Sequence, residues 1–236
     1  KENCDLPICV TMTFDEDGKL LTGATVEAAA LMCEGLGVDA IGFNCGLGPV
    51  QVAKLFPQML AATSLPLIIN PNAGLPVQRD GKTCFDVGPE EYAELMYELA
   101  GKGASIVGGC CGTTPEHIAQ MIAKCKTLQP GGTRDCRLTA VSSYGKAVHL
   151  GEGPIIIGER INPTGKKRLK EALVNGDLDY VCRLGLEQIG VGAQILDVNV
   201  GTPGIDEAAM AAKAVPALQA ITDTPLQIDT SNYEAM

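Results

Sequence analysis

Three cysteines have the residue types and the spacing for metal chemistry. Cys45 lies in the motif GFNCG, and the pair Cys110 and Cys111 lies in the motif GGCCGTTP, each after an apolar, strand-like run. Neighbouring side chains on a strand point to opposite faces, so the pair shares one target only if the chain leaves strand geometry, which the flanking glycines permit. Three converging thiolates favour zinc, and three protein ligands leave a fourth position for water or a substrate.

A closed zinc site that only holds the fold is the alternative, and it requires a fourth protein ligand. The chain has two histidines, His117 and His149. His117 follows Pro115 in the first turn of an expected helix and is expected to point away from the cysteines. His149 lies in a region with nothing to aim it at a metal. The ligand count therefore favours an open, catalytic site.

The composition excludes several classes of protein. The chain has 236 residues and a formal net charge of −10, whereas a nucleic-acid surface needs a basic stripe. No run approaches the roughly 20 apolar residues of a membrane helix, and the start shows no signal-peptide pattern. Ten cysteines in a chain with a regular strand and helix pattern indicate reduced thiols, because such a chain has its own core without a disulfide framework. We therefore expect a cytoplasmic protein that binds neither nucleic acid nor a membrane.

Strand-like and helical segments alternate along residues 1–128. Expected strands cover residues 6–13, 40–43, 66–70 and 105–107, and expected helices cover residues 25–36, 49–63, 89–102 and 115–127. Short apolar runs that alternate with longer helical patterns predict parallel strands in a βαβ series. Both cysteine motifs follow such strands, at the end where functional loops of parallel α/β proteins lie.

Residues 129–152 interrupt this rhythm, and the turn signal QPGGT at residues 129–133 indicates a linker. A second series follows in residues 153–236. Its expected strands cover 154–157, 195–198 and 226–228, and its expected helices cover 166–174, 178–190 and 205–221, the last kinked or broken near Pro216. The pattern predicts an α/β fold with two domains, each with too few strands for a (β/α)₈ barrel. We therefore expect an internal part of a longer protein, while a doubly wound sheet stays compatible with the pattern.

Polar side chains follow several of these strands and are candidates for substrate binding. Thr13 and Asn72 lie at strand ends of the first series. Asp197, Asn199 and Asp229 lie at strand ends of the second series, so they converge on one mouth if those strands are parallel neighbours. The alternatives are local, because an asparagine can hold a turn through its own side chain and strand-end polar residues can cap the following helix.

The motifs also resemble those of known families. GFNCG and GGCCGTTP, with INPNAGLP between them, resemble the zinc signature of the homocysteine S-methyltransferases. IGERINPTG at residues 157–165 is similar to the opening strand of pterin-binding methyltransferase domains, and LDVNVG and IDTSN match the next two strand ends of that family. A homocysteine domain followed directly by a pterin domain resembles the family of cobalamin-dependent methionine synthases. The resemblance covers essentially the whole chain.

This resemblance implies an α/β fold of two (β/α)₈ TIM barrels, each only partly present. Residues 1–128 would form the carboxyl-terminal half of a barrel that binds zinc and homocysteine, and residues 153–236 the amino-terminal part of a barrel that binds methyltetrahydrofolate. The implied activity is a methyltransferase that makes methionine from homocysteine, with 5-methyltetrahydrofolate as methyl donor, through cobalamin on a domain outside this chain. The alternatives are another corrinoid-dependent thiol methyltransferase and a fragment that binds zinc or pterin without turnover.

The resemblance assigns roles to residues of the first domain. Cys45, Cys110 and Cys111 would hold Zn²⁺, which removes the proton of the homocysteine thiol and keeps its sulfur nucleophilic. Asn72 would lie near the zinc or the substrate. Thr13 is a candidate contact for the amino-acid part of homocysteine on its position alone.

In the second domain the family match places Asn162, Thr164 and Asp229 against methyltetrahydrofolate, with Asp197 and Asn199 close by. A carboxylate can accept two N–H bonds from the guanidine-like part of a pterin, and asparagine satisfies an edge of mixed donors and acceptors. Methyl transfer from N5 also needs a better leaving group, which protonation or hydrogen bonding at N5 supplies.

Overall fold

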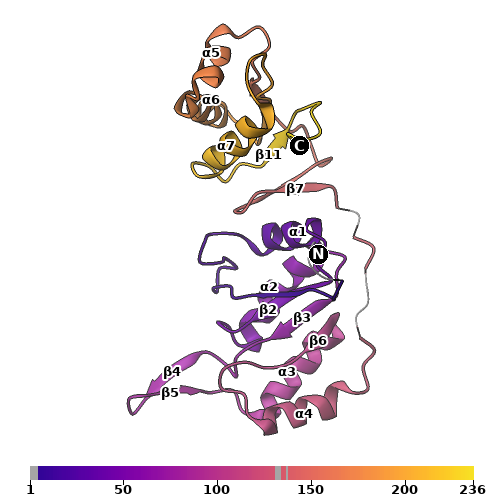
Figure 1. Ribbon diagram of the computed structural model, residues 1–236. Helices are drawn as coiled ribbons and strands as arrows, with labels where there is room; N and C mark the ends of the chain where they lie inside the picture. Colours follow the sequence, from indigo (N-terminus) through magenta and orange to yellow (C-terminus); the bar gives the residue numbers. More distant parts are fainter. Residues whose placement is uncertain (1–4, 131–133, 137) are drawn as a thin grey trace. The chain divides into compact units, whose positions relative to one another are not determined.

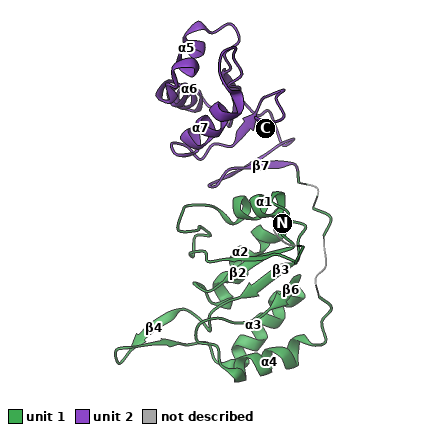
Figure 2. Ribbon diagram, viewed as in Figure 1, with its two compact units in different colours: residues 1–138 green, residues 139–236 purple. Residues whose placement is uncertain are grey.

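The computed structural model of the protein describes residues 5–130, 134–136 and 138–236. The chain divides into two compact units, residues 1–138 (unit 1) and residues 139–236 (unit 2), as Figure 2 shows. Each unit has its own cluster of buried apolar side chains. No helix in the described part of the chain has both the length and the apolar character that crossing a membrane requires.

Unit 1 is built on a parallel sheet of four strands in the order β1-β2-β3-β6 (Figure 1). The strands are β1 (Cys9–Met12), β2 (Ala40–Asn44), β3 (Leu67–Asn70) and β6 (Ala104–Val107), and the helices are α1 (Val26–Gly35), α2 (Pro49–Ala62), α3 (Pro89–Gly101) and α4 (Pro115–Cys125). Because every neighbouring pair is parallel, the carboxyl ends of the four strands lie at one edge of the sheet. The loops that leave this edge carry Cys45 and the Cys110–Cys111 pair.

Local sequence signals start the helices of unit 1. The hydroxyl of Thr25 accepts a hydrogen bond from the Ala28 amide and so caps α1. A proline begins each of the helices α2, α3 and α4, namely Pro49, Pro89 and Pro115. Proline is favoured there because a backbone N–H in the first turn has no acceptor within the helix. These signals explain why the expected helices of unit 1 begin within one residue of the observed ones.

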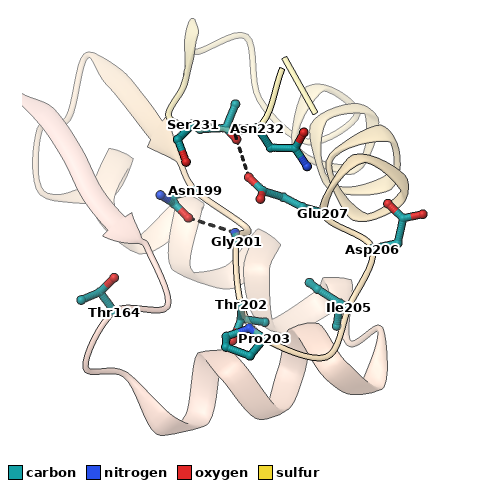
Figure 3. A pocket seen from close by; sticks show the side chains of 11 residues that line it. Thr164, Asn199, Gly201, Thr202, Pro203, Ile205, Asp206, Glu207, Ser231 and Asn232 are labelled. Atoms are coloured by element: carbon teal, nitrogen blue, oxygen red, sulfur yellow. Dashed lines mark hydrogen bonds between the residues drawn. The ribbon is translucent and has the colours of Figure 1, made fainter. Parts of the chain in front are cut away.

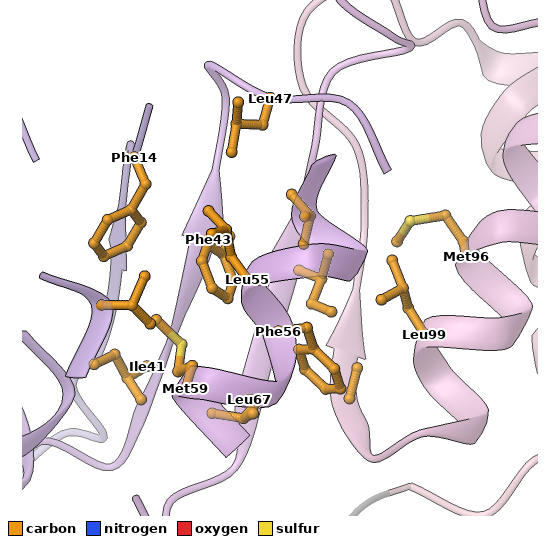
Figure 4. Close-up of a cluster of buried hydrophobic side chains, with 14 of the residues drawn as sticks. Phe14, Ile41, Phe43, Leu47, Leu55, Phe56, Met59, Leu67, Met96 and Leu99 are labelled. Carbon is orange, nitrogen blue, oxygen red and sulfur yellow. The ribbon is translucent and has the colours of Figure 1, made fainter. Parts of the chain in front are cut away.

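The core of unit 1 lies between the sheet and its helices (Figure 4). Ile41 and Phe43 of β2 and Leu67 of β3 belong to one buried cluster with Phe56 and Met59 of α2, and each of these side chains is at most 2% exposed. Burying a side chain of this size stabilises the fold by about 1.5–3 kcal/mol. The core therefore holds the strand ends, and the loops that follow them, in fixed relative positions.

An antiparallel hairpin of β4 (Pro76–Arg79) and β5 (Lys82–Phe85) follows β3 and precedes α3 along the chain, and it projects from the sheet (Figure 1). Asp80 and Gly81 form its turn with φ of 52° and 72°, the left-handed conformation of a type I′ turn. The short, polar strands carry no apolar alternation, so the sequence pattern did not predict this hairpin. At its base, the Phe85 ring packs so closely on Gly112 that a Cβ there would lie 2.3 Å from ring atom Cγ.

Unit 2 contains a parallel sheet of three strands in the order β11-β10-β9. The strands are β9 (Ile157–Ile161), β10 (Ile195–Val198) and β11 (Leu226–Ile228), and the helices are α5 (Lys167–Asn175), α6 (Leu178–Gly190) and α7 (Glu207–Gln219). Leu196 and Val198 of β10 are buried in one cluster with Leu169 of α5 and Leu218 of α7. This core places the carboxyl ends of the three strands at one edge.

A second hairpin, β7 (Ala140–Ser142) and β8 (Ala147–His149), belongs to unit 2 and lies within the expected linker of residues 129–152. The hydroxyl of Ser143 donates to the carbonyl oxygen of Asp223, and the Lys146 ammonium lies 2.9 Å from the Asp223 carboxylate. Asp223 precedes β11, so these bonds attach the hairpin to the amino-terminal side of the unit 2 sheet.

Two expectations for the second series were wrong. The strand expected at residues 154–157 spans Ile157–Ile161 instead, because pairing with β10 aligns Gly158 with Leu196 and Ile161 with Val198. The apolar residues at 154–156 led to the expected earlier start, but they lie outside the hydrogen-bonded pairing of β9 with β10. The break considered near Pro216 is absent, since α7 runs through this residue.

The α/β class with parallel sheets is confirmed in both units. Within the described ranges, the four strands of unit 1 and the three strands of unit 2 form two open sheets without closing into a barrel.

Candidate functional site

Three loops meet at the carboxyl edge of the unit 1 sheet. Cys45 directly follows β2, a short loop follows β3, and Cys110 and Cys111 come after the two glycines that follow β6. These strands are neighbours in this order, so the β3 loop lies between the two loops that carry the cysteines. The Cys45 amide donates to the Asn70 oxygen at 3.0 Å, and the Cys110 amide donates to the Pro71 oxygen at 2.9 Å. Backbone hydrogen bonds thus join both cysteine loops to the β3 loop.

The three thiols converge. The Sγ atom of Cys111 lies 3.6 Å from that of Cys45 and 4.0 Å from that of Cys110, and all three lie within 4.8 Å of one another. Zinc–sulfur bonds of about 2.3 Å at tetrahedral angles separate two sulfurs by about 3.8 Å. The two shorter separations bracket this value, so the donor set fits a zinc ion bound by three thiolates.

Unusual backbone conformations make this convergence possible. Cys45 has φ of 55°, a left-handed conformation that costs a non-glycine residue about 1–3 kcal/mol and persists only where surrounding structure fixes it. The bond to Asn70 and a bond of 2.6 Å from the Leu47 amide to the Cys45 oxygen fix it here. Because β6 ends at Val107, the adjacent pair of cysteines is free of strand alternation and both sulfurs reach one cluster.

Asn72 lies between the two cysteine loops and is 4% exposed. Its backbone N–H donates to the Leu47 oxygen at 2.9 Å, and its side-chain Oδ1 accepts a hydrogen bond from the Cys111 backbone N–H at 3.1 Å. Its side chain is also among the hydrogen-bond partners that lower the pKa of the Cys45 thiol. The Asn72 side chain therefore contacts both cysteine loops. Its described contacts include no side-chain hydrogen bond within its own loop, which the alternative role in a turn would require.

The surroundings of Cys45 and Cys111 shift the pKa values of these two thiols in opposite directions. A hydrogen bond from the Gly46 amide, together with bonds from the Cys110, Cys111 and Asn72 side chains, lowers the pKa of the Cys45 thiol against the opposing effect of burial. In turn, the neighbouring Cys45 and Cys110 side chains raise the pKa of the Cys111 thiol to about 11. Three thiolates at these distances repel one another, and a divalent cation removes that repulsion.

A cavity of about 560 Å³ opens beside Gly46, the residue after Cys45. Thr13, which follows β1, lines this cavity, and its hydroxyl donates to the carbonyl oxygen at the end of β2 at 3.1 Å. Asp15, Glu16 and Lys19 give the cavity wall charges of both signs. Such a wall can pair with both charged ends of a zwitterionic amino acid.

His117 is engaged away from the sulfurs. Its Nδ1 bonds to Thr114 at the start of α4, and its Nε2 lies 3.0 Å from the Val87 oxygen. Within the described residues, the group of possible metal ligands at this place consists of the three cysteines. A fourth ligand from His117, which a closed zinc site would need, is therefore not available in this arrangement.

In unit 2, two of the strand-end candidates are bonded to each other. The Nδ2 atom of Asn199 donates to the Asp229 carboxylate at 3.0 Å, and its Oδ1 accepts the Gly201 amide at 2.9 Å. Asp229 follows β11 and Asn199 follows β10, which are paired strands. The arrangement presents a carboxylate and an amide together at one sheet edge.

Asp197 is buried within β10 and is 5% exposed. Its carboxylate accepts a hydrogen bond from Gln227 Nε2 at 2.8 Å. Burial, followed by the charges of Asp229 and Glu159, raises the pKa of the Asp197 carboxyl despite the bond from Gln227. Two carboxylates close together at a sheet edge suit a ligand that brings hydrogen-bond donors or positive charge.

The remaining candidates lie in the loop after β9. Asn162 Oδ1 accepts the Thr164 amide at 3.0 Å, so this side chain shapes its own loop. Thr164 and Asn199 line a cavity of about 530 Å³ (Figure 3). Asp229 lines a smaller cavity that shares part of this wall, whereas Asn162 and Asp197 line neither.

Some residues of this cavity were absent from the sequence candidates. Glu207, the first residue of α7 (Figure 3), accepts a hydrogen bond from the Thr230 hydroxyl, and both residues line the cavity. Thr230 lies within the IDTSN motif and Glu207 follows the LDVNVG motif, and these places were the signal that could have identified them. The side chain that caps α7 is Asp206, and so helix capping does not account for Asp197 or Asn199.

The homocysteine S-methyltransferase family matches residues 1–125 of the 236, a stretch that contains all three clustered cysteines. The chain belongs to the homocysteine S-methyltransferase family. In this family member, residues 158–236 match a second family, the pterin binding enzymes. The second match covers all three strands of the unit 2 sheet apart from the first residue of β9.

Two curated proteins are similar to this member of the homocysteine S-methyltransferase family over nearly all of its chain. Methionine synthase of Mycobacterium leprae (strain TN) is 32% identical over 239 residues, which cover 98% of this chain and 20% of the relative. Methionine synthase of Mycobacterium tuberculosis (strain ATCC 25618 / H37Rv) is 31% identical over 229 residues, which cover 96% of this chain and 19% of the relative. The chain thus spans about a fifth of the length of these relatives.

Among solved structures, the carboxyl transferase domain of Rhizobium etli pyruvate carboxylase with 3-hydroxypyruvate aligns with 94% of this chain and 35% of its own chain. The identity is 17% and the TM-score is 0.30, too low to bear on the fold of this protein.

Proposed function

We propose that the protein carrying this chain is a cobalamin-dependent methionine synthase. It transfers the methyl group of 5-methyltetrahydrofolate to homocysteine, through cobalamin bound to a domain outside this chain. The observation that carries the proposal is the cluster of three thiols at the joined ends of β2, β3 and β6, in a chain whose two parts match the homocysteine S-methyltransferases and the pterin binding enzymes. The similarity to two mycobacterial methionine synthases supports the same activity.

In this proposal Cys45, Cys110 and Cys111 hold Zn²⁺. Bound zinc lowers the pKa of the homocysteine thiol and so keeps the sulfur a thiolate that can attack a methyl group. The three cysteines would aim that sulfur, because three protein ligands would leave one position on the ion for the substrate. The engagement of His117 with Thr114 and Val87 supports an open fourth position.

The amino-acid part of homocysteine occupies the cavity beside Gly46 in this proposal. The cavity adjoins the Cys45 loop and has Asp15, Glu16 and Lys19 on its wall, which supports recognition of an ammonium and a carboxylate. Thr13 shapes this wall, and its hydroxyl is already bonded to the end of β2. Asn72 keeps the two cysteine loops together while the substrate sulfur enters.

Methyltetrahydrofolate binds at the carboxyl edge of the unit 2 sheet in this proposal. Asp229 offers hydrogen-bond acceptors and Asn199 a mixed donor and acceptor to the pterin edge, and Thr164 lines the cavity of about 530 Å³ together with Asn199. Asp197 adds a second acidic group next to Asp229, while Asn162 orders the β9 loop through the Thr164 amide. This polar edge matches the hydrogen-bonding pattern of a pterin.

We also propose that each sheet is part of a (β/α)₈ barrel. Residues 1–128 belong to the barrel for zinc and homocysteine, residues 129–152 link the two, and residues 153–236 belong to the barrel for methyltetrahydrofolate. Parallel strands joined by helices support this, as do the edge strands: Ile106 of β6 is 46% exposed and Ile157 of β9 is 44% exposed. Edge strands with exposed apolar residues are normally covered by further structure.

We propose a reducing compartment, the cytoplasm, as the place of action. The nine described cysteines are all free thiols, and the tenth, Cys4, lies outside the described residues. Thiolate ligands must stay reduced to bind a metal, and reducing compartments maintain that state.

Methyl transfer from free methylcobalamin to homocysteine, followed as methionine formed, tests the proposal. We expect Cys110→Ala to lower turnover at least about 100-fold, because loss of a ligand exceeds the 10–100-fold effects of outer-shell changes. Cys125→Ala, which removes a half-buried thiol of α4 outside the cluster, is the matched control and should keep wild-type turnover. Equal turnover in Cys110→Ala and wild type would contradict the zinc role, and turnover with other thiols but not homocysteine would contradict the substrate.

A further inference from the structure

We propose that Tyr92 is a positioning residue for the metal-binding cysteines, an inference that rests on the proposed zinc role of the cluster. Tyr92 lies on α3 and its side chain is completely buried. Its hydroxyl oxygen lies 2.8 Å from the carbonyl oxygen of Gly108 and 3.2 Å from that of Pro71. The hydroxyl has one proton, which it donates between these two oxygens.

The two carbonyl groups belong to the loops that form the cluster. Gly108 is the first residue after β6, and its own amide donates to the Ile69 oxygen at 2.9 Å. The Pro71 oxygen also accepts the Cys110 amide at 2.9 Å. The Tyr92 hydroxyl therefore joins the β3 loop to the β6 loop, one hydrogen bond away from Cys110.

Tyr92 is itself held from outside these loops. Its ring meets the His117 ring edge to face, with 5.5 Å between ring centroids and an interplanar angle of 81°. The His117 Nε2 atom is bonded to the Val87 oxygen, and its Nδ1 to Thr114. The edge-to-face contact fixes the Tyr92 hydroxyl with respect to α3 and α4. The hydroxyl can therefore hold the β3 and β6 loops in place.

The sulfur cluster depends on the relative position of these loops. Cys45 follows β2, whereas Cys110 and Cys111 follow β6, and the β3 loop connects them. Without the Tyr92 hydroxyl, the Gly108 oxygen loses this partner and the β6 loop is free to shift. Loss of an outer partner of a metal ligand typically weakens metal binding 10–100-fold.

The chain offers a matched control on the same helix. Tyr97 of α3 is 37% exposed, and its hydroxyl has no hydrogen bond to another described residue. Tyr92→Phe and Tyr97→Phe each remove one oxygen atom from α3 and keep the ring. Only the first change removes a contact to the loops of the cluster.

The experiment is a competition between the full chain and a chelator for Zn²⁺, with thermal unfolding measured on the same samples. We expect Tyr92→Phe to raise the zinc dissociation constant 10–100-fold and Tyr97→Phe to leave it unchanged. A merely structural role for Tyr92 would lower the unfolding temperature of the metal-free chain without changing zinc affinity in the folded protein. That result would overturn the inference.

A second variant, Tyr92→Met, covers the case in which Tyr92→Phe does not fold, because methionine fills the space flexibly and has no donor. Weak zinc binding in a folded Tyr92→Met chain supports the inference. Failure of both variants to fold would make Tyr92 a structural residue and would overturn it. If the wild-type chain itself binds no zinc, the proposed function fails first, so the two failures are distinguishable.

Discussion

The thiol cluster of unit 1 and the polar edge of unit 2 are both built at the carboxyl ends of parallel strands, but they are prepared differently. In unit 1, main-chain bonds hold three thiols close together, and the neighbouring Cys45 and Cys110 side chains raise the pKa of Cys111 to about 11. In unit 2, the side chains satisfy one another, as in the bond from Asn199 to Asp229 and the bond from Gln227 to Asp197. A cation would stabilise the first arrangement once the thiols ionise. In the second arrangement, the side chains already make hydrogen bonds to one another.

The backbone shows the same contrast. Cys45 adopts a left-handed conformation that glycine would adopt more readily, and the loops around it are held by bonds that oxygens of Asn70, Pro71 and Asn72 accept. No described residue of unit 2 other than glycine has a positive φ. The thiol cluster of unit 1 thus includes a strained backbone conformation at Cys45, whereas the hydrogen-bonded edge of unit 2 is formed without one among its described residues.

The largest expected difference between the units is their response to metal removal. At free zinc a hundredfold above the dissociation constant, bound metal stabilises the unit that holds it by about 2.7 kcal/mol. We expect a chelator to remove this stabilisation from unit 1 alone. Hydrogen exchange of amides in β3 and β10 reports the two units separately. Equal acceleration in both strands, or in neither, would contradict the comparison.

The next effect concerns the unit 2 edge. Asp229→Asn is expected to weaken methyltetrahydrofolate binding by roughly 10- to 100-fold, because a hydrogen bond to a charged group contributes about 1.5–3 kcal/mol. Calorimetric titration of the folate measures this. Asp179→Asn, the same change on the exposed first turn of α6, is the control and should bind as the wild type does. An unchanged dissociation constant in Asp229→Asn would remove this residue from the site.

The smallest effect is one of stability and depends on pH. The pKa of Asp197 is raised in the folded chain, so its ionised form is disfavoured there and stability is lost as the pH rises from the unfolded pKa, about 4, through the folded one. Asp197→Asn should therefore be more stable than the wild type at neutral pH, by less than about 1 kcal/mol, and equally stable below about pH 4. Urea unfolding at both pH values measures this. A variant less stable at neutral pH would show that the bond from Gln227 outweighs burial.

Much of the fold and of the candidate cluster followed from local patterns. The alternation of apolar and helical segments gave all seven strands of the two parallel sheets, with β9 shifted along the chain, because apolar spacing and helix-start residues act over a few positions. The sequence pattern did not predict the two hairpins, since their short strands carry little apolar alternation. Their positions depend on contacts with residues far along the chain, such as the bond from Ser143 to Asp223. The place of β9 was likewise decided by its ladder with β10.

By itself, the sequence determined the parallel α/β class, the positions of Cys45, Cys110 and Cys111 after strand ends, and the family to which the chain belongs. Only the tertiary structure decided that the Asn72 carboxamide meets the Cys111 amide and that the Tyr92 hydroxyl joins two loops. The first contact joins the loops that follow β3 and β6, and the second joins α3 to the same two loops. A chain pattern records which groups are present, but which distant groups meet depends on how the packed core orients each strand end.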